Sequence, residues 1–168
     1  MAHEVLWAAW RNAYVVEATQ RERAGEEGGC VFCAIAEEPE VSEATTVVYA
    51  DDLVFVVLNR YPYASGHLLV LPRGHHGMLD ELAPEVSAAL WQAAERAVAA
   101  VQRAYAPDGI NLGANLGQAA GAGIPAHLHL HVLPRWRADT NFMTSIGDTR
   151  VIPDSLEDAW AKLVGAWV

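Results

Sequence analysis

The sequence predicts an α+β protein built on a five-stranded antiparallel sheet, with one long helix packed on it. Two observations support this prediction. Short apolar segments with strand-like alternation gather in two groups, and a long alanine-rich helical segment lies between them. Because strands and helices are segregated rather than strictly alternating, the sheet is expected to be antiparallel. A chain of 168 residues is long enough to bury the core of one domain without disulfides.

The strand predictions depend on β-branched and apolar runs bounded by turn residues. Five strands are expected, at residues 45–49, 53–58, 67–71, 110–114 and 127–133. The first two flank Asp51 and Asp52, a polar turn typical of a hairpin. A loop over residues 59–66 is expected before the third strand, because proline and glycine punctuate it.

Helical composition is found in three segments, at residues 4–21, 84–105 and 154–167. Pro84 favours the start of the long helix, since its ring fits the first helical turn. Apolar residues then follow one side of that helix. We therefore expect a single domain with an N-terminal helical extension over 1–29, a core over 30–137 and a C-terminal extension over 138–168.

Charge and hydrophobicity exclude several classes of partner. The net charge is −10 and Lys162 is the sole lysine, so the surface repels polynucleotides but can still hold a small anionic ligand in a cleft. No apolar run approaches the roughly 18 residues that a membrane span requires. The N-terminus lacks the pattern of a signal peptide. We expect a cytoplasmic protein that binds neither nucleic acid polymers nor membranes.

Residues 127–133 carry the most informative pattern, in which His127, His129 and His131 alternate with aliphatic residues. On a strand, this period places the imidazoles on one outward face and the aliphatic side chains on the core. A neutral imidazole can attack phosphorus when its second nitrogen is held as a donor. His129, flanked by two imidazoles, is the candidate nucleophile. A metal site on the strand and a functionless histidine-rich face are the alternatives.

The segment between the fourth strand and the histidines is rich in glycine. Residues 115–126 contain Gly117, Gly121 and Gly123, and such a loop lets backbone N–H groups approach an anion closely. It lacks the spacing of a P-loop or a dinucleotide fingerprint. Alone it predicts only a hairpin connection, but its position beside three histidines favours an anion-binding role.

The two cysteines form a Cys-x-x-Cys pair, Cys30 and Cys33. In a cytoplasmic chain this spacing is typical of a zinc half-site or a redox pair. A redox pair is expected to open a helix after a βαβ-type strand. Here a charged, glycine-rich stretch over 23–29 precedes the pair, which favours zinc.

The motif HLHLHVL at 127–133 resembles the His-φ-His-φ-His-φ-φ motif of the histidine triad family of nucleotide hydrolases and transferases. The stretches LNRYPYASGHLLVLP, NLGQAAGAGIPAHLHLHVLPRW and DTNFMTSIGDTRVIP are similar to its bacterial branch of diadenosine tetraphosphate phosphorylases. The resemblance implies the fold of this family and an enzyme that cleaves dinucleoside polyphosphates, with phosphorolysis favoured. Hydrolysis, purine nucleoside phosphoramidase activity and a non-catalytic nucleotide-binding module are the alternatives.

The resemblance also implies a role for each matching residue. The catalytic residues are His129, which would be nucleotidylated, His131 at the phosphate and leaving oxygen, and His127. The implied substrate-binding residues are Asn59 at the ribose, His67 in the cleft, Asn115, Ala122 and Gly123 at phosphate oxygens, and Trp136 near the base. Ile124 stands where many hydrolase members carry Ser or Thr, so the sequence leaves the choice between phosphate and water open.

Zinc-bearing relatives in the wider superfamily join a Cys-x-x-Cys pair to two histidines. The resemblance therefore implies a structural zinc ion held by Cys30, Cys33, His75 and His127, with His76 as the alternative to His75. Four protein ligands make a closed site. No organic cofactor is implied. The implied partners are a nucleotide or dinucleoside polyphosphate, inorganic phosphate and a second copy of the chain, with a tetramer as the alternative to a homodimer.

Overall fold

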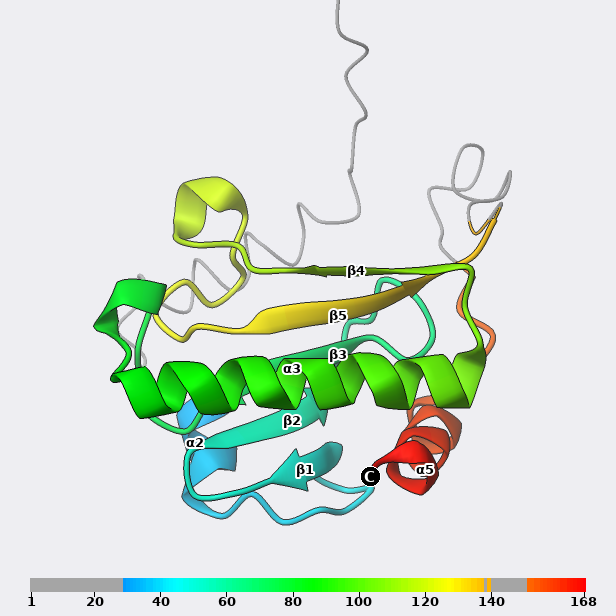
Figure 1. Ribbon diagram of the computed structural model, residues 1–168, viewed down its shortest axis with the longest axis horizontal. Helices are drawn as coiled ribbons and strands as arrows, with labels where there is room; N and C mark the ends of the chain where they lie inside the picture. Colours follow the sequence, from blue (N-terminus) through cyan, green and yellow to red (C-terminus); the bar gives the residue numbers. More distant parts are fainter. Residues whose placement is uncertain (1–28, 138, 140–150) are drawn as a thin grey trace, which may run out of the picture.

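The computed structural model describes residues 29–137, 139 and 151–168, so the helix expected over 4–21 lies outside it. Within the described residues, five strands form one antiparallel sheet in the order β1-β2-β3-β5-β4 (Figure 1). The strands are Val47–Ala50 (β1), Val54–Leu58 (β2), Leu68–Pro72 (β3), Gly109–Gly113 (β4) and Leu130–Arg135 (β5). The predicted five-stranded antiparallel sheet and α+β class are confirmed.

Within residues 29–137 and 151–168, three α-helices and two short 3-10 helices accompany the sheet. They are α2 (Val31–Glu37), η1 (Leu79–Glu81), α3 (Pro84–Tyr105), η2 (Gln118–Ala120) and α5 (Leu156–Ala166). The long helix α3 has the predicted bounds, and Ala106 ends it in the left-handed conformation. In the part of the chain described here, none of the helices has the length and hydrophobicity to span a bilayer.

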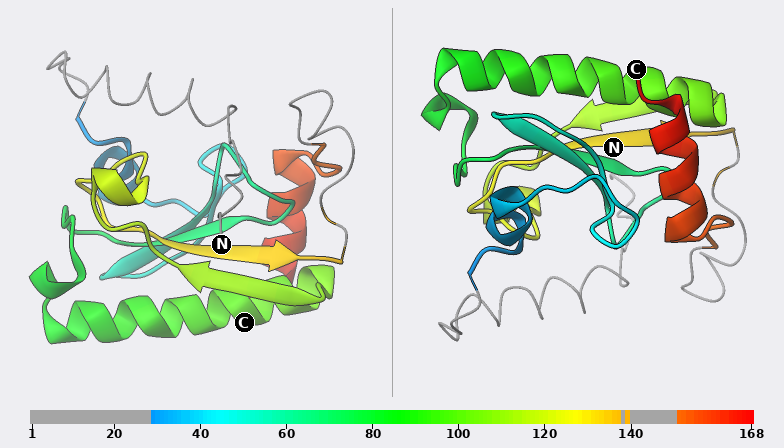
Figure 2. Two further views of the ribbon diagram at one scale, coloured as in Figure 1. Left: turned by 90° about the horizontal axis from the view of Figure 1, so that it is seen from above. Right: turned by 90° about the horizontal axis from the view of Figure 1, so that it is seen from below.

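Helices cover both faces of the sheet. On one face, side chains of β2, β3 and β5 pack with α3 and α5 in a core that includes Val56, Leu90 and Leu163. On the other face, Phe32 and Ala36 of α2 pack with β2 and β3 in a second apolar cluster (Figure 2). This two-sided cover explains why all five residues of β2 are buried. Full burial of one such aliphatic side chain contributes about 1.5–3 kcal/mol.

The cover by α2 corrects the expectation of an outward-facing row of histidines. The sequence analysis predicted a loop leading to the cysteines and did not predict α2. Because this helix packs over the second face, His127 is 0% exposed and His129 is 6% exposed. His127 and His129 are therefore interior, whereas His131 is half-buried.

The strand expected over 127–133 begins at Leu130, so only His131 of the three histidines lies in β5. The pairing of β3 with β5 ends at Val70 and Leu130, and beyond it the N–H of Leu128 donates to the carbonyl of His76, in the turn after β3. The predicted alternation persists, because Leu128 and Leu130 point into the core on the α3 side.

The C-terminal helix α5 is tied to the sheet and to α3. The indole of Trp160 donates to the carbonyl of Val47 at 2.8 Å, and the guanidinium of Arg96 donates to the carbonyl of Val168 at 3.1 Å. Arg96 also lies over the ring of Tyr49, 4.2 Å from its centroid. These contacts join the last helix to elements far away in the sequence.

We expect Leu163→Ala to lower the free energy of unfolding by about 2–5 kcal/mol, because it empties a fully buried site in α5. A urea titration is expected to show one cooperative transition, as a single domain requires. The control Leu53→Ala, at the exposed hairpin turn, is expected to change the free energy by about 0.5 kcal/mol or less. Two separate transitions would contradict a core shared by α5 and the sheet.

Candidate active site and metal cluster

Five rings from separate parts of the chain form a row across the face that α2 covers. The ring centroids of His129 and His131 are 5.0 Å apart. Phe32 of α2 lies 5.5 Å from both His127 and His129. Tyr63, in the loop before β3, stacks at 5.9 Å on His131. The row thus runs from α2, through the three histidines, to the loop that precedes β3.

The backbone sets the tautomer of His129. Its Nδ1 lies 2.8 Å from the carbonyl oxygen of His127. A carbonyl only accepts, so Nδ1 carries the hydrogen and Nε2 presents a lone pair. Burial lowers the pKa of His129, while the hydrogen bond to the His127 carbonyl opposes this effect. The neutral ring that results has the form required of an imidazole nucleophile.

A second chain of hydrogen bonds sets the tautomer of His131. The backbone N–H of Tyr63 donates to Nδ1 of His67 at 3.1 Å, so the hydrogen of His67 lies on Nε2. That N–H donates to Nδ1 of His131 at 2.9 Å. Neutral His131 therefore carries its own hydrogen on Nε2. Asn59, whose side-chain nitrogen lies 3.3 Å from Nδ1 of His67, belongs to the same network. Two adjacent imidazoles thus have opposite functions, since His129 presents an acceptor and His131 a donor.

His127 belongs to a different group. Its Nε2–H donates to the carbonyl of Pro72 at 3.0 Å, which leaves Nδ1 as a lone pair. That Nδ1 lies 3.4 Å from the sulfur of Cys30 and 3.6 Å from the sulfur of Cys33. Nδ1 of His75 lies 3.1 Å from the sulfur of Cys33. The predicted metal set is thus assembled, with all four ligand atoms within 4.8 Å of one another.

This cluster has the chemistry and size of a tetrahedral zinc site. Zinc bonds of the usual length place neighbouring ligand atoms about 3.3–3.8 Å apart, close to the observed spacings. The hydrogen bond from His127 to the Pro72 carbonyl is the kind that orients a metal-binding imidazole. His76, the alternative to His75, lies outside the cluster that the described residues form. The site therefore contains a set of residues able to hold a metal ion.

The position of the cysteines differs in one respect from the sequence analysis. Cys30 directly precedes α2 and Cys33 lies in its first turn, so the pair does open a helix. The sequence analysis associated that position with a redox pair. Both cysteines are free, their thiols contact each other, and the imidazoles of His75 and His127 lie against the same two sulfurs. The arrangement therefore favours metal binding over redox chemistry.

The glycine-rich loop lies at the end of β5 where the histidines are. Because Gly113 of β4 pairs with His131, Asn115 lies beyond that pair, on the side of His129. Ala122 is buried, and its N–H lies 3.5 Å from the carbonyl of Gly117. Gly123 follows it. The loop thus lies at the end of β5, where binding of phosphate by Asn115, Ala122 and Gly123 requires it. The phosphate-binding roles of these three residues stay predictions.

Trp136 lies apart from the histidines. It follows β5 directly and packs edge-to-face against Tyr105 of α3, with ring centroids 6.1 Å apart. At the rise of an extended strand, it lies on the order of 16 Å from His131. The structure therefore does not bring Trp136 to His129 within one chain, and its contact with a base stays a prediction.

Sequence reasoning missed two residues of the site, Phe32 and Tyr63. Phe32 lies between the cysteines, where an apolar run was available as a helix signal. Tyr63 was assigned to a loop, and nothing in its neighbours predicts that its backbone and ring both contact His67. Both contacts depend on how distant segments come together.

Residues 40–138 match the HIT domain. Together with the five-stranded sheet and the histidine row, this match defines the class of the protein: the chain belongs to the HIT, or histidine triad, family. The chain is 37% identical to a Mycobacterium tuberculosis protein named AP-4-A phosphorylase over 163 aligned residues. The aligned region covers 96% of this chain and 83% of that protein.

Solved structures agree with this assignment. A Zn-bound histidine triad family protein from Mycobacterium smegmatis is 31% identical, with a TM-score of 0.66 over 82% of this chain and 92% of that one. A histidine triad nucleotide-binding protein from Sulfolobus tokodaii is 25% identical, with a TM-score of 0.65 over 82% and 91% of the two chains. The fold that the sequence resemblance implied is confirmed.

Proposed function

We propose that the protein is an enzyme that cleaves dinucleoside polyphosphates, and that it converts diadenosine tetraphosphate and inorganic phosphate to ATP and ADP. The observation that carries this proposal is the pair of opposite tautomers. His129 presents a lone pair on Nε2, and His131 beside it presents an N–H. The similarity to the AP-4-A phosphorylase of M. tuberculosis supports the choice of substrate.

In the first step, Nε2 of His129 attacks the α-phosphorus. A P–N bond forms while the bond from phosphorus to the bridging oxygen breaks, and that oxygen keeps the electron pair. ATP leaves as an anion, and the Nε2–H of His131 donates a hydrogen bond to the departing oxygen. The imidazolium that forms keeps its Nδ1–H on the carbonyl of His127, which disperses its positive charge.

In the second step, an oxygen of inorganic phosphate attacks the nucleotidyl group. The new P–O bond forms as the P–N bond breaks, which yields ADP and restores neutral His129. Asn59 would hold the ribose, and Asn115 with the backbone of Ala122 and Gly123 would hold phosphate oxygens. His67 acts as a positioning residue, since it sets the tautomer of His131.

We expect His129→Gly to lower kcat/KM for diadenosine tetraphosphate by at least about 10³-fold, since it removes the attacking nitrogen. Chromatography of the nucleotide products measures the rate. The control His76→Ala, which changes a histidine outside both groups, is expected to retain wild-type turnover. Substantial activity in a folded His129→Gly variant would refute the covalent mechanism.

The acceptor of the second step is tested with wild-type protein in the presence and absence of inorganic phosphate. Phosphorolysis gives ADP with ATP, whereas hydrolysis gives AMP with ATP. We expect ADP to accumulate when phosphate is supplied. Formation of AMP at the same rate in both conditions would favour a hydrolase, and cleavage of adenosine phosphoramidate alone would favour the phosphoramidase alternative.

We propose in addition that Cys30, Cys33, His75 and His127 bind a structural zinc ion. Their four ligand atoms come from α2 and the residue before it, from the turn after β3 and from the segment before β5. When bound, zinc supplies four covalent links among these segments. Both cysteines are free, as is usual in a reducing compartment. We therefore propose a cytoplasmic location.

Purified wild-type protein is expected to contain one zinc ion per chain by elemental analysis. His75→Ala is expected to lose most of this zinc, because it opens a closed four-ligand site, whereas His76→Ala is expected to keep it. Cys30→Ser is expected to behave like His75→Ala. Equal zinc content in the wild type and the three variants would show that the metal binds outside this cluster and would contradict the proposed site.

We also propose a homodimer that forms across β4. This strand is at the edge of the sheet, its residues are mostly exposed, and Leu112 within it is 44% exposed. An exposed apolar edge strand favours pairing with another chain. Trp91 on α3 is also 44% exposed and offers a large apolar contact.

Leu112→Glu is expected to shift the protein from dimer to monomer, because a buried carboxylate opposes the interface. Sedimentation velocity measures the change. The control Val41→Glu alters an equally exposed apolar residue before β1 and is expected to leave the dimer intact. A monomeric wild type, or loss of the dimer in both variants, would contradict this interface.

A further inference from the structure

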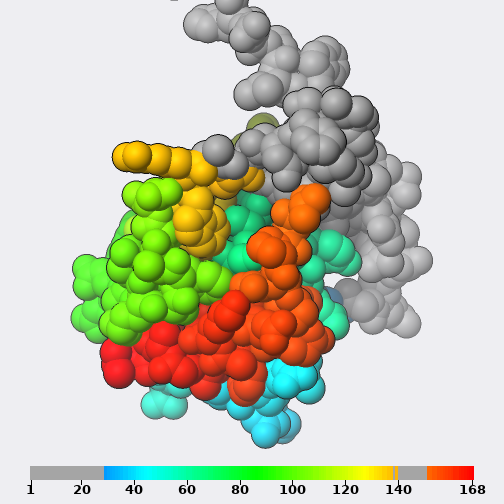
Figure 3. Space-filling view, turned by 90° about the vertical axis from the view of Figure 1, so that its right-hand side faces the viewer, coloured from blue at the N-terminus to red at the C-terminus, as the bar shows by residue number. Residues whose placement is uncertain are grey.

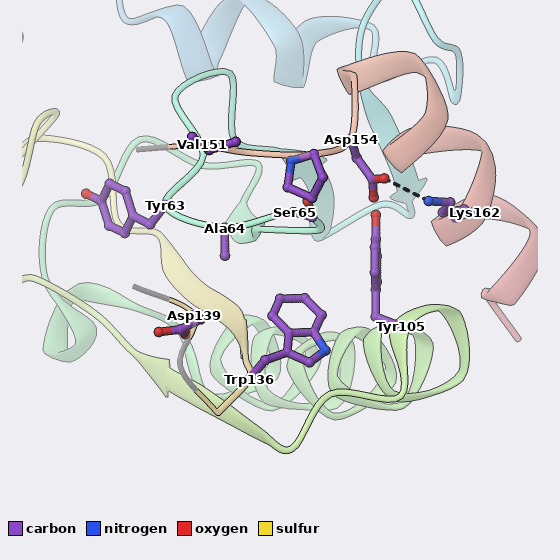
Figure 4. Close-up of a pocket in the computed structure, with 10 residues that line it drawn as sticks. Tyr63, Ala64, Ser65, Tyr105, Trp136, Asp139, Val151, Asp154 and Lys162 are labelled. Atoms are coloured by element: carbon purple, nitrogen blue, oxygen red, sulfur yellow. Dashed lines mark hydrogen bonds and ion pairs between the residues drawn. The ribbon is translucent and has the colours of Figure 1, made fainter. Parts of the chain in front are cut away.

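A pocket of about 330 Å³ lies at the far end of β5 from His129 (Figure 4). Its walls come from the loop before β3, from the end of α3 and from the segment leading into α5, which Figure 3 shows packed closely together. Trp136 and Tyr105 supply aromatic surface. Ser65, Asp154 and Lys162 supply polar groups. None of these residues takes part in the mechanism described above.

One wall of the pocket contains a polar atom that is not satisfied by the described residues. Ser65 is only 7% exposed, and its hydroxyl has no hydrogen-bond partner among them. The hydroxyl of Tyr105 points toward Asp154 in Figure 4, and burial together with this carboxylate raises the pKa of Tyr105. Buried polar groups usually have partners, so a ligand that supplies hydrogen bonds would complete this wall.

The charges in the pocket argue against a phosphate group. The single lysine, Lys162, is paired with Asp154 at 2.9 Å. Asp139 is paired with Arg135 through both carboxylate oxygens. Among the described lining residues, the net charge is therefore small and no cation is left unpaired for an anion. Aromatic faces with a few hydrogen-bonding groups suit a flat, neutral, polar ligand, such as a nucleobase with its ribose.

The pocket adjoins the histidine row on the side of His131. Tyr63 lines the pocket and stacks on His131, and Ser65 lies in the same loop, two residues before His67. The pocket therefore lies on the His131 side of the attacked phosphorus, and this is the side on which the leaving group departs in the proposed mechanism. The distance of about 16 Å along β5 requires a long linker, which a polyphosphate chain provides.

We infer that this pocket binds the nucleoside of the leaving nucleotide, so that the enzyme selects polyphosphates with a nucleoside at both ends. The inference rests on the proposed function. It assigns Trp136 to the leaving half of the substrate, as a stacking surface for its base, and assigns the hydroxyl of Ser65 to a hydrogen bond with that nucleoside.

The test compares diadenosine tetraphosphate with adenosine 5′-tetraphosphate, which has the same phosphate chain but lacks the second nucleoside. Loss of a base-stacking surface is expected to lower kcat/KM of Trp136→Ala about tenfold for the first substrate and to leave the second unchanged. Trp136→Phe keeps an aromatic face and is expected to retain most of the activity. An equal fall for both substrates, or no fall for either, would overturn the inference.

Ser65→Ala gives a second test, because this substitution is expected to lower the activity without lowering the stability of the protein. Because the hydroxyl lacks a partner in the described structure, its removal is expected to leave the melting temperature unchanged or higher. The kcat/KM for diadenosine tetraphosphate is nevertheless expected to fall severalfold, with adenosine 5′-tetraphosphate unaffected. Unchanged activity on both substrates would contradict the role of Ser65. Wild-type protein that cleaves neither substrate would overturn the proposed function itself, and this inference with it.

Discussion

The hydrogen bond from Nδ1 of His129 to the carbonyl of His127 is the interaction on which the site depends. The two residues are only two positions apart in the sequence, yet the orientation of the His127 carbonyl depends on the contacts that fix the His127 side chain. The imidazole of His127 is fixed on one side by the Pro72 carbonyl and on the other by the two cysteine sulfurs. The candidate metal ligands and the proposed nucleophile, His129, are thus linked through two residues of backbone. A change in the cluster reaches Nε2 of His129 through the orientation of a single peptide group.

The interior position of the histidines gives these hydrogen bonds their strength. With α2 over one face of the sheet and α3 over the other, the tautomers are set away from bulk water, where competing hydrogen bonds are few. The same burial disfavours the charged form of His129. In the proposed mechanism, the charge that develops on this ring meets dipoles that are already oriented, chiefly the His127 carbonyl.

Sequence patterns predicted the parts of the fold that depend on local periodicity. The bounds of α3 follow from Pro84 and the apolar stripe, and the alternation around His129 correctly separates core residues from imidazoles. The start of β5 at Leu130 could not be predicted, since it depends on a hydrogen bond from Leu128 to His76, in the turn after β3. The apolar run of α2 was a helix signal that was not used, because the Cys-x-x-Cys pair that overlaps it was interpreted as a metal half-site. The tautomer network of His67 and His131 was beyond prediction, because it depends on a backbone N–H of Tyr63, a contact that no residue pattern encodes.

The four potential metal ligands also bear on how the chain folds. Cys33 and His75 are 42 residues apart, and Cys33 and His127 are 94 residues apart. An ion shared by these side chains would act as a cross-link over most of the core, and it would reduce the conformational entropy of the unfolded chain. In the simple loop-closure view, this entropic gain increases slowly with loop length and is already considerable at such separations. The metal would thus stabilise the protein through the disordered state that it restricts, as well as through the bonds it makes in the folded one.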